Sequence, residues 1–282
     1  MKRFALPAVA VLLLSGCASQ PPVDDEPPAS PPMFAEPGVG ESDALGLVNL
    51  WRVSDAEGEG DETWLRLDAN EFQLWRDCGM IMGSWRASNE LFLASVDSAS
   101  GECAPASVPT VEWLESATAF AQTADGYQLL SGDQTVASLT IDGSPEPIDT
   151  AAEFYTQPPE ITDEGRARFA APAPLPDELE PATADALDGV WVAGSVASTE
   201  PHVAFNADNT WTGSDGCNGG SGRWAVSGSG EFLATSGPST LIFCEGAPIP
   251  SWLAQSASAG LDPDGLLHLF DAVGAELGVL TR

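Results

Sequence analysis

The chain has 282 residues, with 42 Asp or Glu against only 10 Lys or Arg, so its formal net charge at pH 7 is −32. Nucleic acids and anionic membrane surfaces repel a chain so acidic, and no basic cluster interrupts it, which argues against nucleic-acid binding. The single lysine, Lys2, lies at the start of the chain. The rest of the chain therefore has no lysine for Schiff-base chemistry.

Residues 1–16 have the pattern of a secretory signal: the basic Met1-Lys2-Arg3, a short apolar run, and small residues before Cys17. The apolar run is shorter than the roughly 20 residues that span a membrane. Leu14-Ser15-Gly16-Cys17 also matches the bacterial lipobox, in which the cysteine is diacylated and becomes the new N-terminus. We therefore expect lipidation at Cys17 and a lipid-anchored place in the cell membrane or envelope, outside the cytoplasm. An ordinary signal peptide with a chance cysteine is the alternative.

Two proline-rich stretches divide the remaining chain. Seven prolines lie between Pro21 and Pro37, and eight between Pro145 and Pro181. Proline fixes the backbone and like charges extend it, so residues 17–43 are expected to form a semi-rigid, disordered tether. Residues 144–185 are expected to form a second, extended linker with at most a short helical turn within Ile161–Ala170.

The segments 44–143 and 186–282 are predicted to be two copies of one module. Each contains the pattern C-x4-G-x-W, as Cys78 to Trp85 and as Cys217 to Trp224. Further landmarks recur in register, namely Trp51 and Trp191, Phe72 and Trp211, Cys103 and Cys244, and Trp113-Leu114 and Trp252-Leu253. A run of matches in the same order indicates an internal duplication.

Short runs of aromatic and branched residues bounded by turn residues predict strands in each module. They cover 47–53, 63–67, 71–75, 202–205, 210–213, 266–270 and 277–280. Apolar residues at helical spacing predict one helix within 108–122, and a second, short helix starts at Pro248. The expected fold class is α+β: two tandem modules, each a curved antiparallel sheet or partial barrel with one packed helix.

Four cysteines remain besides Cys17, namely Cys78, Cys103, Cys217 and Cys244. In an exported protein an even number of cysteines predicts disulfides, and four allow three connectivities. The repeat favours Cys78–Cys103 and Cys217–Cys244. Structural zinc sites usually contain close C-x2-C pairs, which are missing here, so neither a metal nor a cofactor is predicted.

The second copy resembles the META domain, the family of the heat-shock protein HslJ. The resemblance rests on Gly216-Cys217-Asn218 followed by Gly222 and Trp224, and is supported by Thr240–Cys244 and Leu187–Trp191. The first copy has Gly79 where the family has Asn, and lacks a Thr four residues before Cys103. The resemblance implies a fold far more than a reaction.

Candidate catalytic residues are scarce. The only histidines, His202 and His268, fall in predicted strands, and no nucleophile elbow or paired-histidine motif is present. The acidic stretch 57–62 lacks the ligand spacing of a calcium loop and is expected to be a solvated loop. Six of nine tryptophans are at repeat-matched positions, where they fill the core or line an aromatic groove.

These observations predict a non-catalytic, stress-related or ligand-binding envelope protein, with no catalytic residue assigned. Expected partners are the membrane, through the anchor, and an envelope protein, a glycan or a small apolar ligand. The binding surface is predicted near Asn218 and Trp224, the alternative being that Asn218 only caps a turn. An envelope hydrolase or a protease-inhibitor-like regulator is the competing function. The proline-rich linker predicts that the modules share little interface and fold alone.

Overall fold

The computed structural model describes residues 43–89, 91–104, 108–149, 151–194, 200–240, 242–243 and 245–282. All of them belong to one compact unit, Pro37–Arg282. The predicted signal segment 1–16, Cys17, nearly all of the tether 17–43 and Cys244 lie outside the described residues. Within the described ranges, no helix has the length and apolar character needed to cross a membrane.

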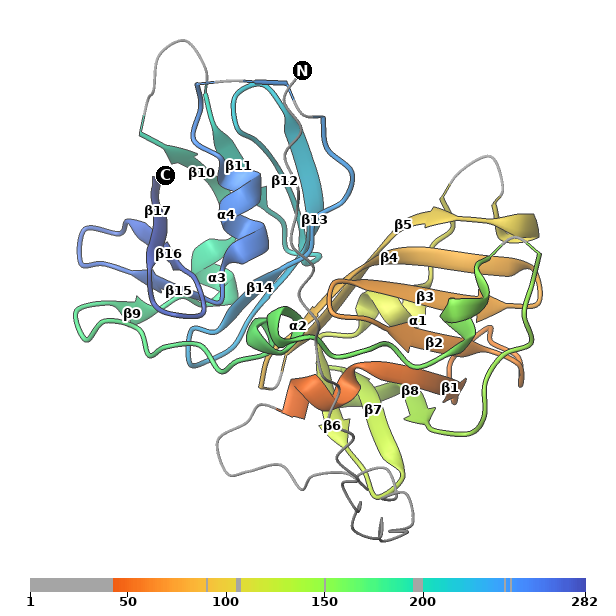
Figure 1. Ribbon diagram of the computed structural model, residues 1–282. Coiled ribbons are helices and arrows are strands. Elements are labelled where there is room, and N and C mark those ends of the chain that lie inside the picture. Colours follow the sequence, from red (N-terminus) through yellow and green to blue (C-terminus); the bar gives the residue numbers. More distant parts are fainter. Residues whose placement is uncertain are drawn as a thin grey trace, which may run out of the picture. The chain divides into compact units, whose positions relative to one another are not determined.

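The first module forms an antiparallel sheet with the strand order β5-β4-β3-β2-β1-β8-β7-β6 (Figure 1). Its strands are β1 Asn49–Ser54, β2 Trp64–Leu67, β3 Glu71–Arg76, β4 Gly79–Ala87, β5 Phe92–Ala99, β6 Ala119–Gln122, β7 Gly126–Ser131 and β8 Gln134–Thr140. Its short helical segments are η1 Asp43–Leu47, η2 Gly101–Cys103 and α1 Glu112–Ser116. Helix α1 packs against β5 and β8.

The second sheet, formed by the second module and the end of the linker, has the order β14-β13-β12-β11-β10-β17-β16-β15-β9. Its strands are β9 Glu180–Pro181, β10 Gly189–Ala193, β11 His202–Phe205, β12 Thr210–Ser214, β13 Gly219–Val226, β14 Phe232–Ala234, β15 Ser258–Leu261, β16 Leu267–Phe270 and β17 Glu276–Thr281. Its helices are α3 Ala184–Leu187 and α4 Ile249–Gln255, and α4 lies across the sheet (Figure 1).

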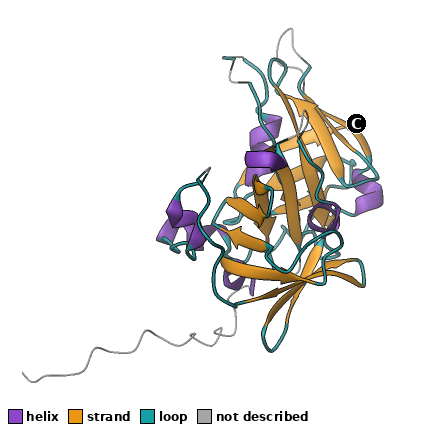
Figure 2. Ribbon diagram, turned by 90° about the vertical axis from the view of Figure 1, so that its right-hand side faces the viewer, coloured by secondary structure: helices purple, strands orange, loops and turns teal. Residues whose placement is uncertain are grey.

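The duplication is visible in the topology, because β10 to β17 repeat the order of β1 to β8. The eight repeated strands of each sheet also curl until the outermost two are joined by an equivalent single bridge, Leu91 with Ala119 in the first and Glu231 with Ser258 in the second. The fold class is therefore α+β, with two curved antiparallel sheets and few, short helices (Figure 2).

Matching tryptophans anchor the two cores in the same way. The indole Nε1 of Trp51 donates to the backbone oxygen of Leu47 at 2.7 Å, and that of Trp191 donates to Leu187 at 2.7 Å. Both rings are buried. Each bond fastens the first strand of a module to the short helical turn before it.

The glycine of C-x4-G-x-W is required by a close approach between strands. A Cβ on Gly83 would overlap the backbone oxygen of Ser95, and a Cβ on Gly222 would overlap that of Thr235. Backbone atoms cannot move aside as a flexible side chain can. Only glycine therefore fits where β4 crosses β5 and where β13 passes the segment after β14.

The predicted helix within 108–122 is wrong over its second half. Helix α1 ends at Ser116, and the residues from Ala119 to Gln122 form β6, which pairs with β7 from Tyr127 to Leu130. The helical spacing of apolar residues was outweighed by the backbone hydrogen bonds that β7 offers.

The linker is packed on the modules rather than extended throughout. Helix α2, Asp163–Arg168, lies within the predicted turn, and its N-cap Thr162 accepts a hydrogen bond from the backbone of Gly165. The buried ring of Phe169 lies 5.4 Å from that of Trp85, and β9 pairs with β15. These contacts make the linker a strap over both modules, because its apolar residues find buried partners.

The prediction that the modules share little interface is wrong. Leu91 and Leu93 of the first module form a buried cluster with Ala225 and Leu233 of the second. The hydroxyls of Ser95 and Thr235 lie 2.6 Å apart in a buried hydrogen bond.

The interface joins equivalent positions of the repeat. Leu93 and Ser95 follow Phe92 at the same spacing as Leu233 and Thr235 follow Phe232. In a two-fold symmetric dimer, the same surface of each subunit faces its partner. The two modules face each other in the same way within one chain.

Candidate functional site

The cysteine motifs come first among the predicted site residues. Cys78 and Cys103 form a disulfide with their Cα atoms 4.9 Å apart. Cys217 is disulfide-bonded as well, whereas its predicted partner Cys244 lies outside the described residues. The pairing of Cys217 with Cys244 stays a prediction.

Asn218 is a buried node of hydrogen bonds. Its Oδ1 accepts from the hydroxyl of Thr240 and from the backbone N–H of Ile242, both at 2.7 Å. Its Nδ2 donates to the backbone oxygen of Ile242 at 2.8 Å and to the carboxylate of Asp215 at 2.9 Å. Asn218 therefore ties the turn at Asp215 to the segment that precedes Cys244, which is a structural role.

The predicted binding surface is not exposed as expected. Trp224 is 2 % exposed and belongs to the core of the second module, while Asn218 is 7 % exposed. Beside Asn218, Ile242 and Phe243 are instead exposed, by 61 % and 92 %. Of the six repeat-matched tryptophans, Trp252 is half-buried and the others are buried in the cores, so the space between helix and sheet is filled.

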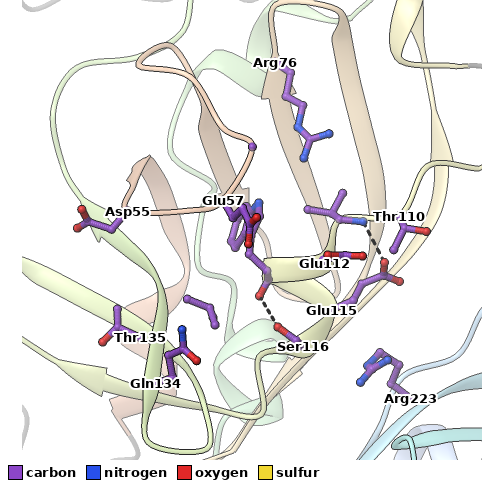
Figure 3. A pocket seen from close by; sticks show the side chains of 14 residues that line it. Asp55, Glu57, Arg76, Thr110, Glu112, Glu115, Ser116, Gln134, Thr135 and Arg223 are labelled. Atoms are coloured by element: carbon purple, nitrogen blue, oxygen red, sulfur yellow. Dashed lines mark hydrogen bonds between the residues drawn. The ribbon is translucent and has the colours of Figure 1, made fainter.

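An open pocket of about 920 Å³ lies beside α1, and we name it the α1 pocket (Figure 3). Its lining residues are Asp55, Glu57, Gly58, Arg76, Thr110, Val111, Glu112, Trp113, Glu115, Ser116, Gln134, Thr135, Val136 and Arg223. The loop after β1, helix α1 and the start of β8 supply most of the wall, and Arg223 comes from β13 of the second module.

Three carboxylates of the α1 pocket are unpaired. Asp55, Glu57 and Glu112 make no side-chain hydrogen bond or ion pair with any described residue. Asp55 also has a φ of 55°, a left-handed conformation that is uncommon for residues other than glycine. Glu115 is engaged, because it accepts the backbone N–H of Val111 at 3.0 Å.

The acidic stretch 57–62 is only partly the solvated loop that was expected. The side chain of Glu59 is 3 % exposed and points inward, where it pairs with Arg76. It also accepts from Trp113 Nε1 at 2.6 Å and from the hydroxyl of Thr63 at 3.2 Å. Four donors satisfy this carboxylate, which is why it is stable away from water.

Arg223 brings a partly buried positive charge to the α1 pocket. Burial lowers the pKa of its guanidinium, and the carboxylates of Glu115 and Asp208 only partly offset this effect. Its Nε is buried and has no hydrogen-bond partner. Sequence reasoning missed this residue, because nothing in the spacing of β13 indicates that it faces the first module.

Both ring nitrogens of His268 and one of His202 have hydrogen-bond partners. His268 Nδ1 lies 2.8 Å from Glu276 and its Nε2 lies 3.5 Å from Asp262. His202 is exposed, with its Nδ1 2.9 Å from the backbone oxygen of Glu200. With carboxylates at both of its nitrogens, His268 has none left to activate a serine, as a general base would require.

No group of three or more His, Cys, Asp or Glu side chains is placed to hold a metal ion in the described ranges. In comparisons with known proteins, no family model, curated protein or solved structure matches the chain. The fold and the geometry of the pocket thus define the class: a duplicated, curved-sheet protein with a carboxylate-rich pocket beside its first helix.

Proposed function

We propose that this chain is an exported, lipid-anchored envelope protein with two META-like modules that binds a ligand without transforming it. The ligand is a basic peptide segment of an envelope protein, held in the α1 pocket. The observation that carries the proposal is the set of unpaired carboxylates, Asp55, Glu57 and Glu112, around one open pocket.

Charge supports this choice of ligand. The α1 pocket has four carboxylates against two guanidinium groups. A cleft with an excess of one sign of charge raises the local concentration of oppositely charged ligands, and the net charge of −32 adds to the attraction. Among the expected partners, a polar and acidic pocket suits a basic protein segment better than a small apolar ligand. A glycan would leave the three carboxylates without counter-charges.

The competing hydrolase has less support. His268 was the best candidate for a general base, and carboxylates face both of its ring nitrogens.

The experiment is calorimetric titration of hexalysine into the chain from residue 18 onward. The variant Asp55→Asn/Glu57→Gln/Glu112→Gln should bind about tenfold more weakly, since each exposed ion pair contributes roughly 0.2–1 kcal/mol. Binding to the unaltered chain should also weaken with added salt.

A matched control removes three exposed carboxylates from the linker, as Glu160→Gln/Asp177→Asn/Glu178→Gln. It makes the same change in net charge away from the pocket. If the control weakens binding as much as the pocket variant does, the attraction is diffuse and the α1 pocket is not the site.

The anchor has its own test. Cys17→Ser should release the protein from the membrane fraction or block its processing. A variant that stays in the membrane at its mature size would show that lipidation at Cys17 is wrong.

A further inference from the structure

A second pocket, of about 630 Å³, lies where the two modules and α2 meet, and we name it the junction pocket. Its lining residues are Ala69, Asn70, Ser84, Trp85, Arg86, Ala87, Glu164, Ala167, Arg168, Phe169, Ala234, Thr235, Ser236, Ala254, Gln255, Asp271, Ala272 and Val273. Two of these eighteen are arginines, in a chain that has 42 acidic residues and only 10 basic ones.

Arg86 holds its charge there without a carboxylate. Its Nη1 donates to the backbone oxygens of Ala254 at 2.8 Å and Leu253 at 3.4 Å, at the C-terminal end of α4. Carbonyl oxygens satisfy donors but carry no full negative charge. Burial and, to a smaller extent, the neighbouring cation Arg168 lower the pKa of Arg86 to about 10.

Three of the eight described arginines, Arg52, Arg66 and Arg76, form an ion pair with a carboxylate within 4.0 Å. No such pair forms among the described residues for the other five, and of these Arg86 and Arg168 line the same pocket.

The two carboxylates of the junction pocket do not supply the missing charge. Asp271 accepts the backbone N–H groups of Val273 at 3.0 Å and Ala275 at 2.8 Å, which commits one of its oxygens to its own turn. Glu164, on α2, makes no ion pair with a described residue.

An independent observation marks the same place. The hydroxyl of Ser236, which lines the junction pocket, is buried and has no hydrogen-bond partner. A buried polar group without a partner costs free energy, so such groups are normally satisfied. One cavity is thus lined by two arginines without ion pairs and by a serine whose buried hydroxyl has no partner.

We propose that the junction pocket binds the oxyanion group of a small organic acid, a phosphate or a carboxylate, through Arg86, Arg168 and Ser236. Guanidinium groups bind such oxyanions through two parallel hydrogen bonds. The apolar part of the ligand lies against Ala272 and Val273. The site lies apart from the α1 pocket and takes the opposite charge.

The plain alternative is that Arg86 only clamps α4 to the first module. Arg168 distinguishes the two readings, because it is exposed and its side chain makes no hydrogen bond with a described residue, so it has no clamping role. Arg166 is a matched control on the same helix: it is exposed too, and it does not line the pocket.

The test titrates inorganic phosphate and, separately, acetate into the chain from residue 18 onward at constant ionic strength. Saturable binding should be seen for at least one probe, and the tighter one identifies the oxyanion class. Arg168→Gln should weaken it about tenfold, the loss of one charge-assisted hydrogen bond, and Ser236→Ala should weaken it by a smaller factor. Arg166→Gln should leave the affinity within about twofold.

Two results would overturn the proposal. One is the absence of saturable binding of either probe to the unaltered chain. The other is an equal effect of Arg168→Gln and Arg166→Gln, because attraction would then come from the charge of α2 as a whole. Neither result bears on the binding of hexalysine in the α1 pocket.

Discussion

The two modules share a topology but fasten their cysteine motifs by different means. In the first, the backbone N–H of Ser100 donates to Met80 at 2.8 Å and that of Cys103 donates to Cys78 at 3.1 Å. In the second, the side chain of Asn218 bridges to both polar backbone groups of Ile242. A direct backbone contact and an amide side chain thus make the same connection between the first cysteine and the segment before the second.

Gly79 explains the difference. Its φ is 137°, and a Cβ at this position would come within 2.5 Å of the backbone oxygen of Ser100. The first module therefore needs glycine to bring two backbones together, whereas the second keeps them apart and fills the gap with an amide. Both modules therefore keep the connection between the two cysteine segments, one through a backbone contact that requires glycine and the other through a side-chain amide.

The largest loss of stability is expected at the glycine that both modules share in C-x4-G-x-W. Gly83→Ala and Gly222→Ala each force a Cβ into a backbone oxygen, so each should cost about 3 kcal/mol of unfolding free energy or prevent folding. Urea unfolding measures this cost, with circular dichroism to detect loss of the fold.

Gly228→Ala is the control, because nothing lies within 4 Å of a Cβ there. If all three variants unfold at the same urea concentration, the close approach of the strands is not what selects glycine in the motif.

The disulfide of the first module should contribute nearly as much. Cys103→Ser opens a loop with a sequence separation of 25 residues. In the chain-entropy model this costs about 3 kcal/mol, mostly by freeing the unfolded state. Denaturation with and without a reductant measures it, and reduction should remove the difference between variant and unaltered chain. Peptide mapping that joined Cys78 to Cys217 would contradict the repeat-based pairing.

Asn218→Ala tests the amide bridge of the second module. It leaves the buried backbone groups of Ile242 without partners, so a loss of about 2 kcal/mol in unfolding free energy is expected. Thermal unfolding measures the loss, and hexalysine titration runs beside it. If the variant keeps its stability but no longer binds hexalysine, Asn218 belongs to a binding surface, as the sequence predicted, and its structural role is wrong.

The smallest effect on stability is expected at Asp97. In the repeat, Asp97 of the first module corresponds to Gly237 of the second. Each lies two residues after one of the two paired hydroxyls, those of Ser95 and Thr235. Burial raises the pKa of Asp97 to about 6; Glu115 adds to the rise, while hydrogen bonds from Ser84 oppose it. The folded state therefore holds this proton more tightly than the unfolded chain, where the pKa is about 3.9.

The resulting contribution to stability is fully present below about pH 4 and is lost as pH rises through about 6. Asp97→Asn should consequently be slightly more stable than the unaltered chain at pH 7.5, with the difference shrinking below pH 6. Urea unfolding across this range measures the difference. A constant difference at all pH values would show that Asp97 does not titrate in the folded state as described.

Sequence spacing predicted what depends on local pattern. The duplication, the strands around Trp51 and Trp191, the pairing of Cys78 with Cys103 and the turn at α2 all follow from repeats, alternation and capping residues. Such signals lie within a few residues or recur at matched positions, so one sequence is enough to find them.

Packing between distant segments decided the rest. The residues from Ala119 became a strand because β7 lay beside them, and Glu59 turned inward because Arg76 and Trp113 met it. The module interface and the grouping of Arg86 with Arg168 likewise bring together residues far apart in the chain. No local pattern encodes these neighbours, because each depends on how whole sheets curl and meet, and that is settled only when the core is packed.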